Sequence, residues 1–330
     1  MMEEELSVSS HDGAWLAGTL SVPEQARALF VPIHGSQVQT RDGSLDASRH
    51  WIFPFGGPQR NLFLDLRARL LPLNAAVYRY DKRASGASEG IYAKTTLDDL
   101  AKDLIAVCAK LKERFPSLPL LVLGQSEGTL TIPRACELGL LPDGIILQGA
   151  VSWPARRIFE FQRTHAGRPF LEDKTGEMSR KFPFYAGYYR AMVSTEFWER
   201  LADPAQSEFV VALPGGYRAV QSLEMVRQWD ACDSRRFLKT VSCPVHYIMG
   251  TRDENTPAEA IEELAAWVAQ ERLPHARFHF LDGLDHNFRR LEPGDNFIES
   301  AKKPIDSGYL ELFSGIVSSL LDKIPAPARA

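Results

Sequence analysis

The sequence predicts an α/β protein with a mostly parallel sheet of eight strands flanked by helices. Short apolar segments alternate with segments of helical periodicity along residues 28–150 and 244–321, which is the order that βαβ units produce. A Gly-x-Ser-x-Gly sequence, residues 124–128, lies directly between one apolar segment and one helical segment. The alternation is interrupted once, because residues 151–238 contain helical patterns but no obvious buried strand.

The eight expected strands begin with a hairpin, in which the first two strands join around residues 11–13 (His-Asp-Gly), a typical turn sequence. Helices are expected where apolar residues recur at helical spacing, as they do from residue 97 to 111. A later helix is expected to start with Thr256 as its N-cap and Pro257 in its first turn. The expected strands are 6–10, 15–22, 28–34, 75–80, 118–123, 144–149, 244–250 and 277–281, and the expected helices are 97–111, 129–138, 257–270 and 309–321.

We expect three regions along the chain. Residues 1–150 and 239–330 form the core, and residues 151–238 form an inserted helical lid over the carboxyl ends of the strands, where open parallel sheets bind ligands. The first half of the insertion is rich in aromatic residues. We expect most of them to build the insertion's own small core and a minority to line a substrate pocket. The long loop at 36–60 is also expected to be functional.

Composition narrows the possible functions. The 330 residues carry a net charge of −4. Because a nucleic-acid-binding protein needs a basic face, nucleic-acid binding is not expected. No apolar run approaches the roughly 18 residues that span a bilayer, so stable membrane insertion is not expected. The N-terminus is acidic where a secretory signal is basic, which predicts a cytoplasmic protein. The four cysteines show no metal-binding spacing, so a metal is not expected. No other cofactor is expected either. The sequence is compatible with a homo-oligomer and does not specify the oligomeric state.

Ser126 is the predicted nucleophile. A serine between a strand and a helix occupies a strained backbone conformation that raises its Oγ above the sheet, and such a turn needs small residues two positions before and after it. Gly124 and Gly128 satisfy this requirement. The free N–H groups at the start of the following helix point toward any oxyanion formed there. A buried serine in a purely structural turn is the alternative.

A serine nucleophile needs a histidine base and a carboxylate that orients the base. In this architecture the carboxylate and the histidine should follow later strands, in that order. Asp253 follows the strand predicted at 244–250, with its neighbour Glu254 as the second choice, and His286 follows the strand predicted at 277–281. His275 precedes that last strand and His279 lies within it, where packing is the better interpretation.

Two backbone N–H groups are expected to form an oxyanion hole. One belongs to Glu127, directly after the nucleophile, and the other to Ser36, in the loop after the third strand. His34, which ends that strand, is expected to be structural. Asp81 and Arg83, after the fourth strand, are expected to stabilise their loop rather than to act in catalysis.

These motifs resemble the α/β-hydrolase superfamily, and in particular serine-aminopeptidase-like esterases and lipases with a helical lid. The resemblance covers about residues 6–150 and 240–323, and it implies the roles given above for the triad and the oxyanion donors. Gln37 departs from the family pattern, in which many members have glycine. A Trp-Ile-Phe-Pro-Phe segment at 51–55 is expected to narrow the acyl pocket. The motifs are residues 33–36, 80–83 with Gly86 and Ser88, 124–128, 250–253 and 283–286.

The expected activity is hydrolysis of a small-molecule carboxylic ester through an acyl-enzyme, with an apolar acyl or alcohol group of modest size. Amide, peptide or thioester hydrolysis by the same triad is the first alternative. An aminopeptidase would need acidic residues in the insertion to hold the substrate amine, and four are available there: Glu160, Glu172, Asp173 and Glu177. A non-catalytic ligand-binding protein on the same fold is the second alternative.

Overall fold

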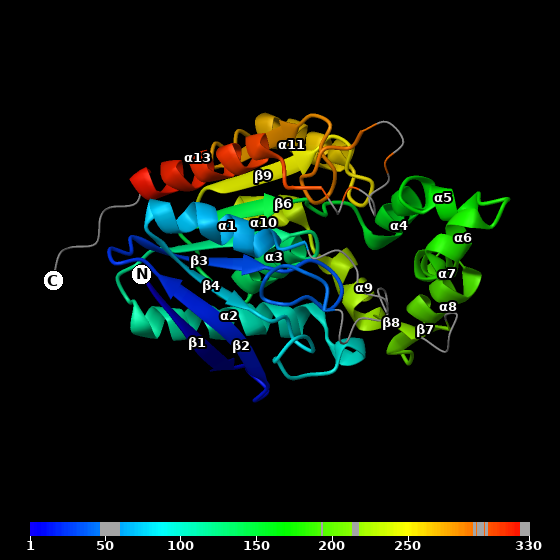
Figure 1. Cartoon of the computed structure of the whole chain (residues 1–330), viewed down its shortest axis with the longest axis horizontal. Coiled ribbons are helices and arrows are strands. Elements are labelled where there is room, and N and C mark those ends of the chain that lie inside the picture. The colour runs from blue at the N-terminus through cyan, green and yellow to red at the C-terminus, as the bar shows by residue number, and fades with distance from the viewer. Residues whose placement is uncertain are drawn as a thin grey trace.

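The computed structural model describes residues 1–46, 60–192, 194–212, 218–292, 295, 300 and 303–323. Its centre is an eight-stranded sheet with the order β1-β2-β4-β3-β5-β6-β9-β10 (Figure 1). The strands are β1 (Met2–Ser9), β2 (Trp15–Val22), β3 (Ala28–Ile33), β4 (Ala75–Tyr80), β5 (Leu120–Gln125), β6 (Gly144–Gln148), β9 (Val245–Gly250) and β10 (Ala276–Leu281).

The sheet is mostly parallel, as predicted. Only β1 with β2 and β2 with β4 pair in antiparallel fashion, and every other neighbouring pair is parallel. The central strands β3, β4, β5 and β6 are buried along their whole length, which explains why they are continuous apolar runs rather than alternating ones. The first strand begins at Met2, four residues before the predicted start. Three of the four extra residues are glutamates, a composition that is untypical of strands.

Helices cover both faces of the sheet. The apolar faces of α2 (Leu97–Arg114), α3 (Gly128–Glu137), α10 (Ser234–Thr240) and α11 (Ala258–Glu271) pack on one side, and α1 (Leu62–Leu70) and α13 (Ser307–Lys323) pack on the other. Short 3₁₀ turns, η1 (Leu71–Leu73) and η2 (Tyr92–Lys94), precede β4 and α2. Among the helices in the described part of the chain, none is long and apolar enough to cross a membrane.

The predicted start of α11 is wrong by one residue. The helix begins at Ala258 with Pro257 as its N-cap, and Thr256 makes no capping bond. Instead, the Thr256 hydroxyl donates a hydrogen bond to Asp253 Oδ2 at 2.8 Å. The side chain expected to cap the helix therefore helps to hold a carboxylate of the site.

The insertion between β6 and β9 lies beyond the carboxyl ends of the parallel strands (Figure 1). It differs from the expected all-helical segment by an antiparallel hairpin, β7 (Glu208–Ala212) with β8 (Arg218–Ser222). Most of its aromatic side chains pack in two clusters. One consists of insertion residues alone, and the other also includes Leu97, Leu100 and Leu130 of α2 and α3, so the insertion's core is partly shared with the rest of the fold. The division into three regions and the role of the insertion as a lid stay predictions. Its helices are α4 (Ala155–Thr164), α5 (Arg168–Leu171), α6 (Glu177–Lys181), α7 (Pro183–Met192), α8 (Thr195–Ala202) and α9 (Leu223–Ala231).

Candidate active site

Ser126 lies in a strained turn between β5 and α3. Its φ of 53° is in the left-handed region, a conformation that non-glycine residues rarely adopt and that is found at functional sites. The turn leaves no space for a side chain two residues before or two residues after the serine. A Cβ at Gly128 would lie 2.7 Å from the carbonyl oxygen of Ile33, and a Cβ at Gly124 would collide with the carbonyl of Gly128. The spacing of the two glycines therefore follows from close backbone packing.

The carboxylate of Asp253 and the ring of His286 meet at the carboxyl ends of β9 and β10. His286 Nδ1 donates to Asp253 Oδ2 at 2.7 Å. Asp253 Oδ1 accepts two backbone hydrogen bonds, from the N–H groups of Asn255 and Thr256, both at 2.8 Å. Because this buried carboxylate is held from several directions, it fixes both the tautomer and the orientation of the imidazole.

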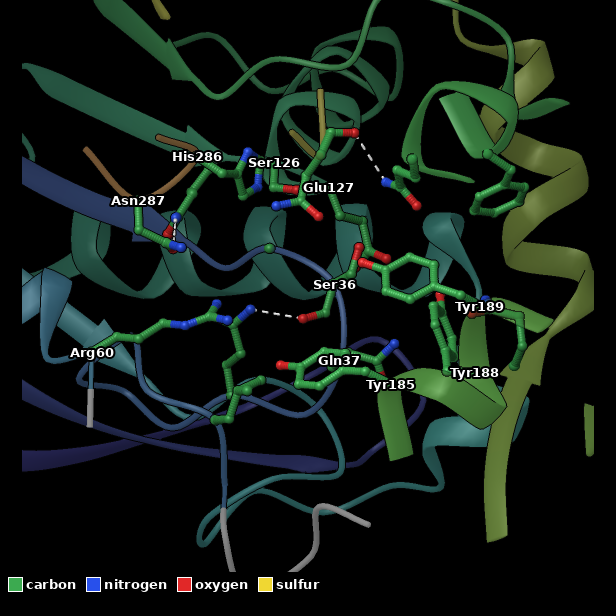
Figure 2. Close-up of a pocket in the computed structure, with 18 of the residues that line it drawn as sticks. Ser36, Gln37, Arg60, Ser126, Glu127, Tyr185, Tyr188, Tyr189, His286 and Asn287 are labelled. Atoms are coloured by element: carbon green, nitrogen blue, oxygen red, sulfur yellow. Dashed lines mark hydrogen bonds between the residues drawn. The ribbon is translucent and has the colours of Figure 1, made fainter. Parts of the chain in front are cut away.

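The imidazole of His286 lies beside Ser126 in the same pocket (Figure 2). Gly149, at the end of β6, makes room for it, because a Cβ there would lie 2.9 Å from His286 Cε1. Since Nδ1 is hydrogen-bonded to Asp253, Nε2 is the nitrogen available to the serine. Within the described residues no hydrogen bond joins Ser126 Oγ to that nitrogen. Such bonds are often long in unliganded enzymes and tighten when substrate binds.

The other acid and histidine residues considered from the sequence do not take part in the Asp253–His286 hydrogen bond. Burial raises the pKa of Glu254, but its neighbour Asp253 is the residue that receives the His286 bond. His275 Nε2 donates to the carbonyl of Leu238 at 2.9 Å. His279 stacks on His246 across β10 and β9, with ring centroids 5.3 Å apart, so the packing role predicted for it agrees with its position.

Ser36 and Glu127 both line the pocket beside Ser126. Neither backbone N–H has a hydrogen-bond acceptor among the residues that the structure describes, so both are available to a ligand. The loop that carries Ser36 approaches the nucleophile closely, because a Cβ at Gly35 would lie 3.1 Å from Ser126 Cβ. Gln37 follows with a φ of 72°, in the region that the glycine of the family pattern adopts without strain.

A buried lysine joins the two segments that carry these N–H groups. Lys82 Nζ donates to Glu127 Oε1 at 2.6 Å, to the carbonyl of Gly35 at 2.7 Å and to the carbonyl of Gln37 at 3.1 Å. The last two groups flank Ser36 on either side. Both side chains of the ion pair are almost fully buried, with exposed fractions of 3% for Lys82 and 2% for Glu127. The sequence indicated no role for Lys82, although this residue belongs to the motif at 80–83 and lies between the two residues noted after β4.

Those two neighbours have the loop-stabilising role that we expected. Asp81 accepts hydrogen bonds from the side chain and the backbone N–H of Arg41, and Arg83 forms ion pairs with Asp12 and Asp103. His34 is also structural. Its Nε2 donates to the carbonyl of Thr40 at 3.2 Å, and burial lowers its pKa to about 3, which keeps the ring neutral.

The pocket around Ser126 is more polar than the sequence suggested. Three tyrosines of α7 line it (Figure 2). The aromatic rings of Phe159 and Trp229, several side-chain amides and Arg60 complete much of the lining. The segment at 51–55 that was expected to narrow the pocket lies outside the described residues. The amide-bearing residues are Gln37, Gln39, Gln125, Gln162, Gln221, Asn255 and Asn287.

The sheet order, the flanking helices and the turn at Ser126 define an α/β hydrolase. The family model described as serine aminopeptidase, S33 (Hydrolase_4) matches residues 59–290. The chain therefore belongs to this family, and the resemblance noted from its motifs is confirmed. Comparison with curated protein sequences finds no significant match.

Solved structures of similar fold include several esterases. The esterase Est1E from Butyrivibrio proteoclasticus, bound to ferulic acid, has a TM-score of 0.58 and 18% sequence identity, covering 96% of this chain and 100% of that one. The Pyrococcus furiosus esterase Pf2001 has a TM-score of 0.58 and 14% identity, covering 98% and 91%. A lipase in an open form has a TM-score of 0.58 and 16% identity, covering 98% and 99%. At these identities the likeness concerns the fold.

Proposed function

We propose that the protein is a serine hydrolase that cleaves small-molecule carboxylic esters through an acyl-enzyme. The observation that carries this proposal is the His286 ring, held by Asp253 at 2.7 Å and lying beside a serine in a strained strand-to-helix turn (Figure 2). The strained backbone at the serine costs free energy, and the hydrogen bond to Asp253 fixes the position of the His286 ring. A purely structural turn needs neither feature. Together they are the parts that nucleophilic catalysis needs.

In the proposed mechanism, His286 Nε2 removes the proton from Ser126 Oγ as this oxygen attacks the ester carbonyl. The N–H groups of Ser36 and Glu127 donate to the oxyanion of the tetrahedral intermediate. The imidazolium, stabilised by Asp253, then protonates the departing alcohol. Water repeats the sequence with His286 as base, which releases the carboxylic acid and restores the serine.

The lining of the pocket favours an ester over a peptide with a free amino terminus. An aminopeptidase needs an unpaired carboxylate near the nucleophile to hold the substrate ammonium. The four acidic residues of the insertion considered above are absent from the described lining, which contains a single carboxylate, Glu127. Because Lys82 neutralises that carboxylate, the described lining offers no free anion to an amine.

The test compares turnover of a p-nitrophenyl ester, an acyl thioester and an aminoacyl-anilide by the wild-type protein and by Ser126→Ala. We expect the ester to be hydrolysed fastest, and Ser126→Ala to lose at least about 10³-fold in kcat. Ser314→Ala is the matched control, because this serine lies on α13 and its hydroxyl donates within its own helix, to the carbonyl of Leu310. Turnover retained in Ser126→Ala, or faster cleavage of the anilide, would contradict the proposal.

A further inference from the structure

We propose that Arg60 selects esters that carry a carboxylate on the acyl or the alcohol side, and that it binds this carboxylate inside the pocket. The inference rests on the proposed ester hydrolysis and names the substrate class for it. It replaces the expectation of a purely apolar acyl or alcohol group with an amphiphilic substrate that has one anionic end.

Arg60 lines the same pocket as Ser126 and His286. Figure 2 shows its side chain extending into the pocket from the side of Asn287. Its guanidinium has neither a hydrogen-bond acceptor nor an ion-pair partner among the residues that the structure describes. Glu127, the carboxylate of the described lining, is already neutralised by Lys82. Of the charged side chains in that lining, Arg60 is thus the permanent charge that is left without a counterion.

A second guanidinium lies behind the first. Arg289 is buried, and it donates to the backbone carbonyls of Lys303 at 2.7 Å and of Arg60 at 3.0 Å. No carboxylate of the described residues forms an ion pair with it. Burial lowers the pKa of Arg289, the negative charge of Asp285 partly opposes this, and the positive charge of Arg60 lowers the pKa further. Arg289 therefore holds the backbone of Arg60 and adds a second positive charge near this side of the pocket.

The remaining lining suits a carboxylate as well. The amide groups of Asn287 and Gln37 are uncharged and polar, and burial raises the pKa of Tyr188 to about 12, so its hydroxyl stays protonated. An anion in this pocket meets no free negative charge in the described lining. A planar carboxylate also matches the forked donors of a guanidinium, which makes the pair directional and stronger than a hydrogen bond between neutral groups.

The experiment uses matched substrates that differ by one charge. Mono-p-nitrophenyl suberate and its terminal carboxamide test the acyl side, and 4-acetoxybenzoate and 4-acetoxybenzamide test the alcohol side. For at least one pair we expect the wild-type enzyme to have a kcat/KM about tenfold higher for the carboxylate, the size of one charge-assisted hydrogen bond in a partly exposed site. Because screening weakens such pairs, the advantage should shrink as salt is added.

Arg60→Gln should bring the carboxylate-to-carboxamide ratio of kcat/KM close to one, and Arg60→Lys should keep part of the preference. Arg163→Gln is the control, because this arginine of α4 is exposed and lies outside the described lining of the pocket. Its ratio should equal that of the wild type. Circular dichroism checks the fold of each variant, and the salt dependence of the wild type decides the matter if Arg60→Gln does not fold.

The outcomes separate the two claims. Equal rates on both members of each pair, or a preference that persists in Arg60→Gln, would overturn the assignment of Arg60 and leave ester hydrolysis intact. A wild-type protein that hydrolyses none of the four esters would overturn the proposed function, and the assignment of Arg60 with it.

Discussion

The buried pair of Lys82 and Glu127 allows a quantitative prediction. Lys82→Met keeps the length and most of the apolar stem of the side chain but removes its charge. Glu127, which is 2% exposed, is then left without a cation, and the carbonyls of Gly35 and Gln37 lose a donor. Removing one partner of a buried ion pair costs about 3–5 kcal/mol. We therefore expect the free energy of unfolding to fall by about that amount.

A double-mutant cycle isolates the pair from the packing change. Glu127→Gln keeps an oxygen that can accept from Lys82, so it should cost less than Lys82→Met. The variant that carries both substitutions has no unpaired charge, and it should recover most of the stability lost in Lys82→Met. The difference between the double variant and the sum of the single variants gives the coupling energy.

Urea unfolding with linear extrapolation measures the stability, and hydrolysis of a short p-nitrophenyl ester measures activity. Because Lys82 binds the two carbonyls that flank Ser36, its loss should lower kcat by about 10- to 100-fold, less than deletion of an oxyanion donor, and leave KM nearly unchanged. A Lys82→Met protein within about 0.5 kcal/mol of the wild type would behave like a surface substitution. That result, or a double variant as unstable as the single one, would refute the reasoning.

Three further predictions concern the turn, the acid and a buried histidine. Gly124→Ala should abolish activity and reduce soluble expression, because its Cβ collides with backbone, whereas Gly315→Ala, where nothing lies within 4 Å, should be neutral or slightly stabilising. Asp253→Asn should lower kcat by about 10³- to 10⁴-fold through loss of the correct His286 tautomer, with the fold preserved by circular dichroism. Burial lowers the pKa of His34 to about 3, so only the unfolded chain takes up this proton as the pH falls from about 6.5 toward 3. The stabilising contribution of the neutral His34 ring is complete above about pH 6.5 and is lost between about pH 6.5 and 3, at about 1.4 kcal/mol per pH unit. The free energy of unfolding, measured by urea titration at a series of pH values, should therefore fall more steeply in the wild type than in His34→Gln, by this slope. Parallel plots of the two free energies against pH would contradict the prediction.

The sheet and the positions of the site residues could be predicted because they depend on local patterns. Buried parallel strands are continuous apolar runs, so the chain shows where each strand ends. Ser126 and Asp253 follow the ends of such strands, and His286 follows the partly exposed edge strand β10. The carboxyl ends of parallel strands meet at one edge of the sheet. The structure accordingly brings the acid into contact with the histidine and places the serine in the same pocket.

The features that could not be predicted depend on contacts between loops. Lys82 and Glu127 lie 45 positions apart, and nothing in either segment indicates that the two side chains share one buried space. The β7–β8 hairpin is short and partly exposed, so it lacks the apolar run that marks the strands of the sheet. Arg60 is similarly an ordinary arginine in sequence, and its significance comes from the absence of a counterion in the described lining of the pocket.

The central claim is that Ser126 is a nucleophile activated by His286, and covalent labelling tests it most directly. The native protein is treated with a fluorophosphonate probe, digested and analysed by peptide mass spectrometry. The account predicts a single adduct on Ser126 in the wild type and in Ser314→Ala, none in Ser126→Ala, and greatly slowed labelling in His286→Gln. Equal labelling of Ser126→Ala, or an adduct on another residue of the wild type, would contradict it.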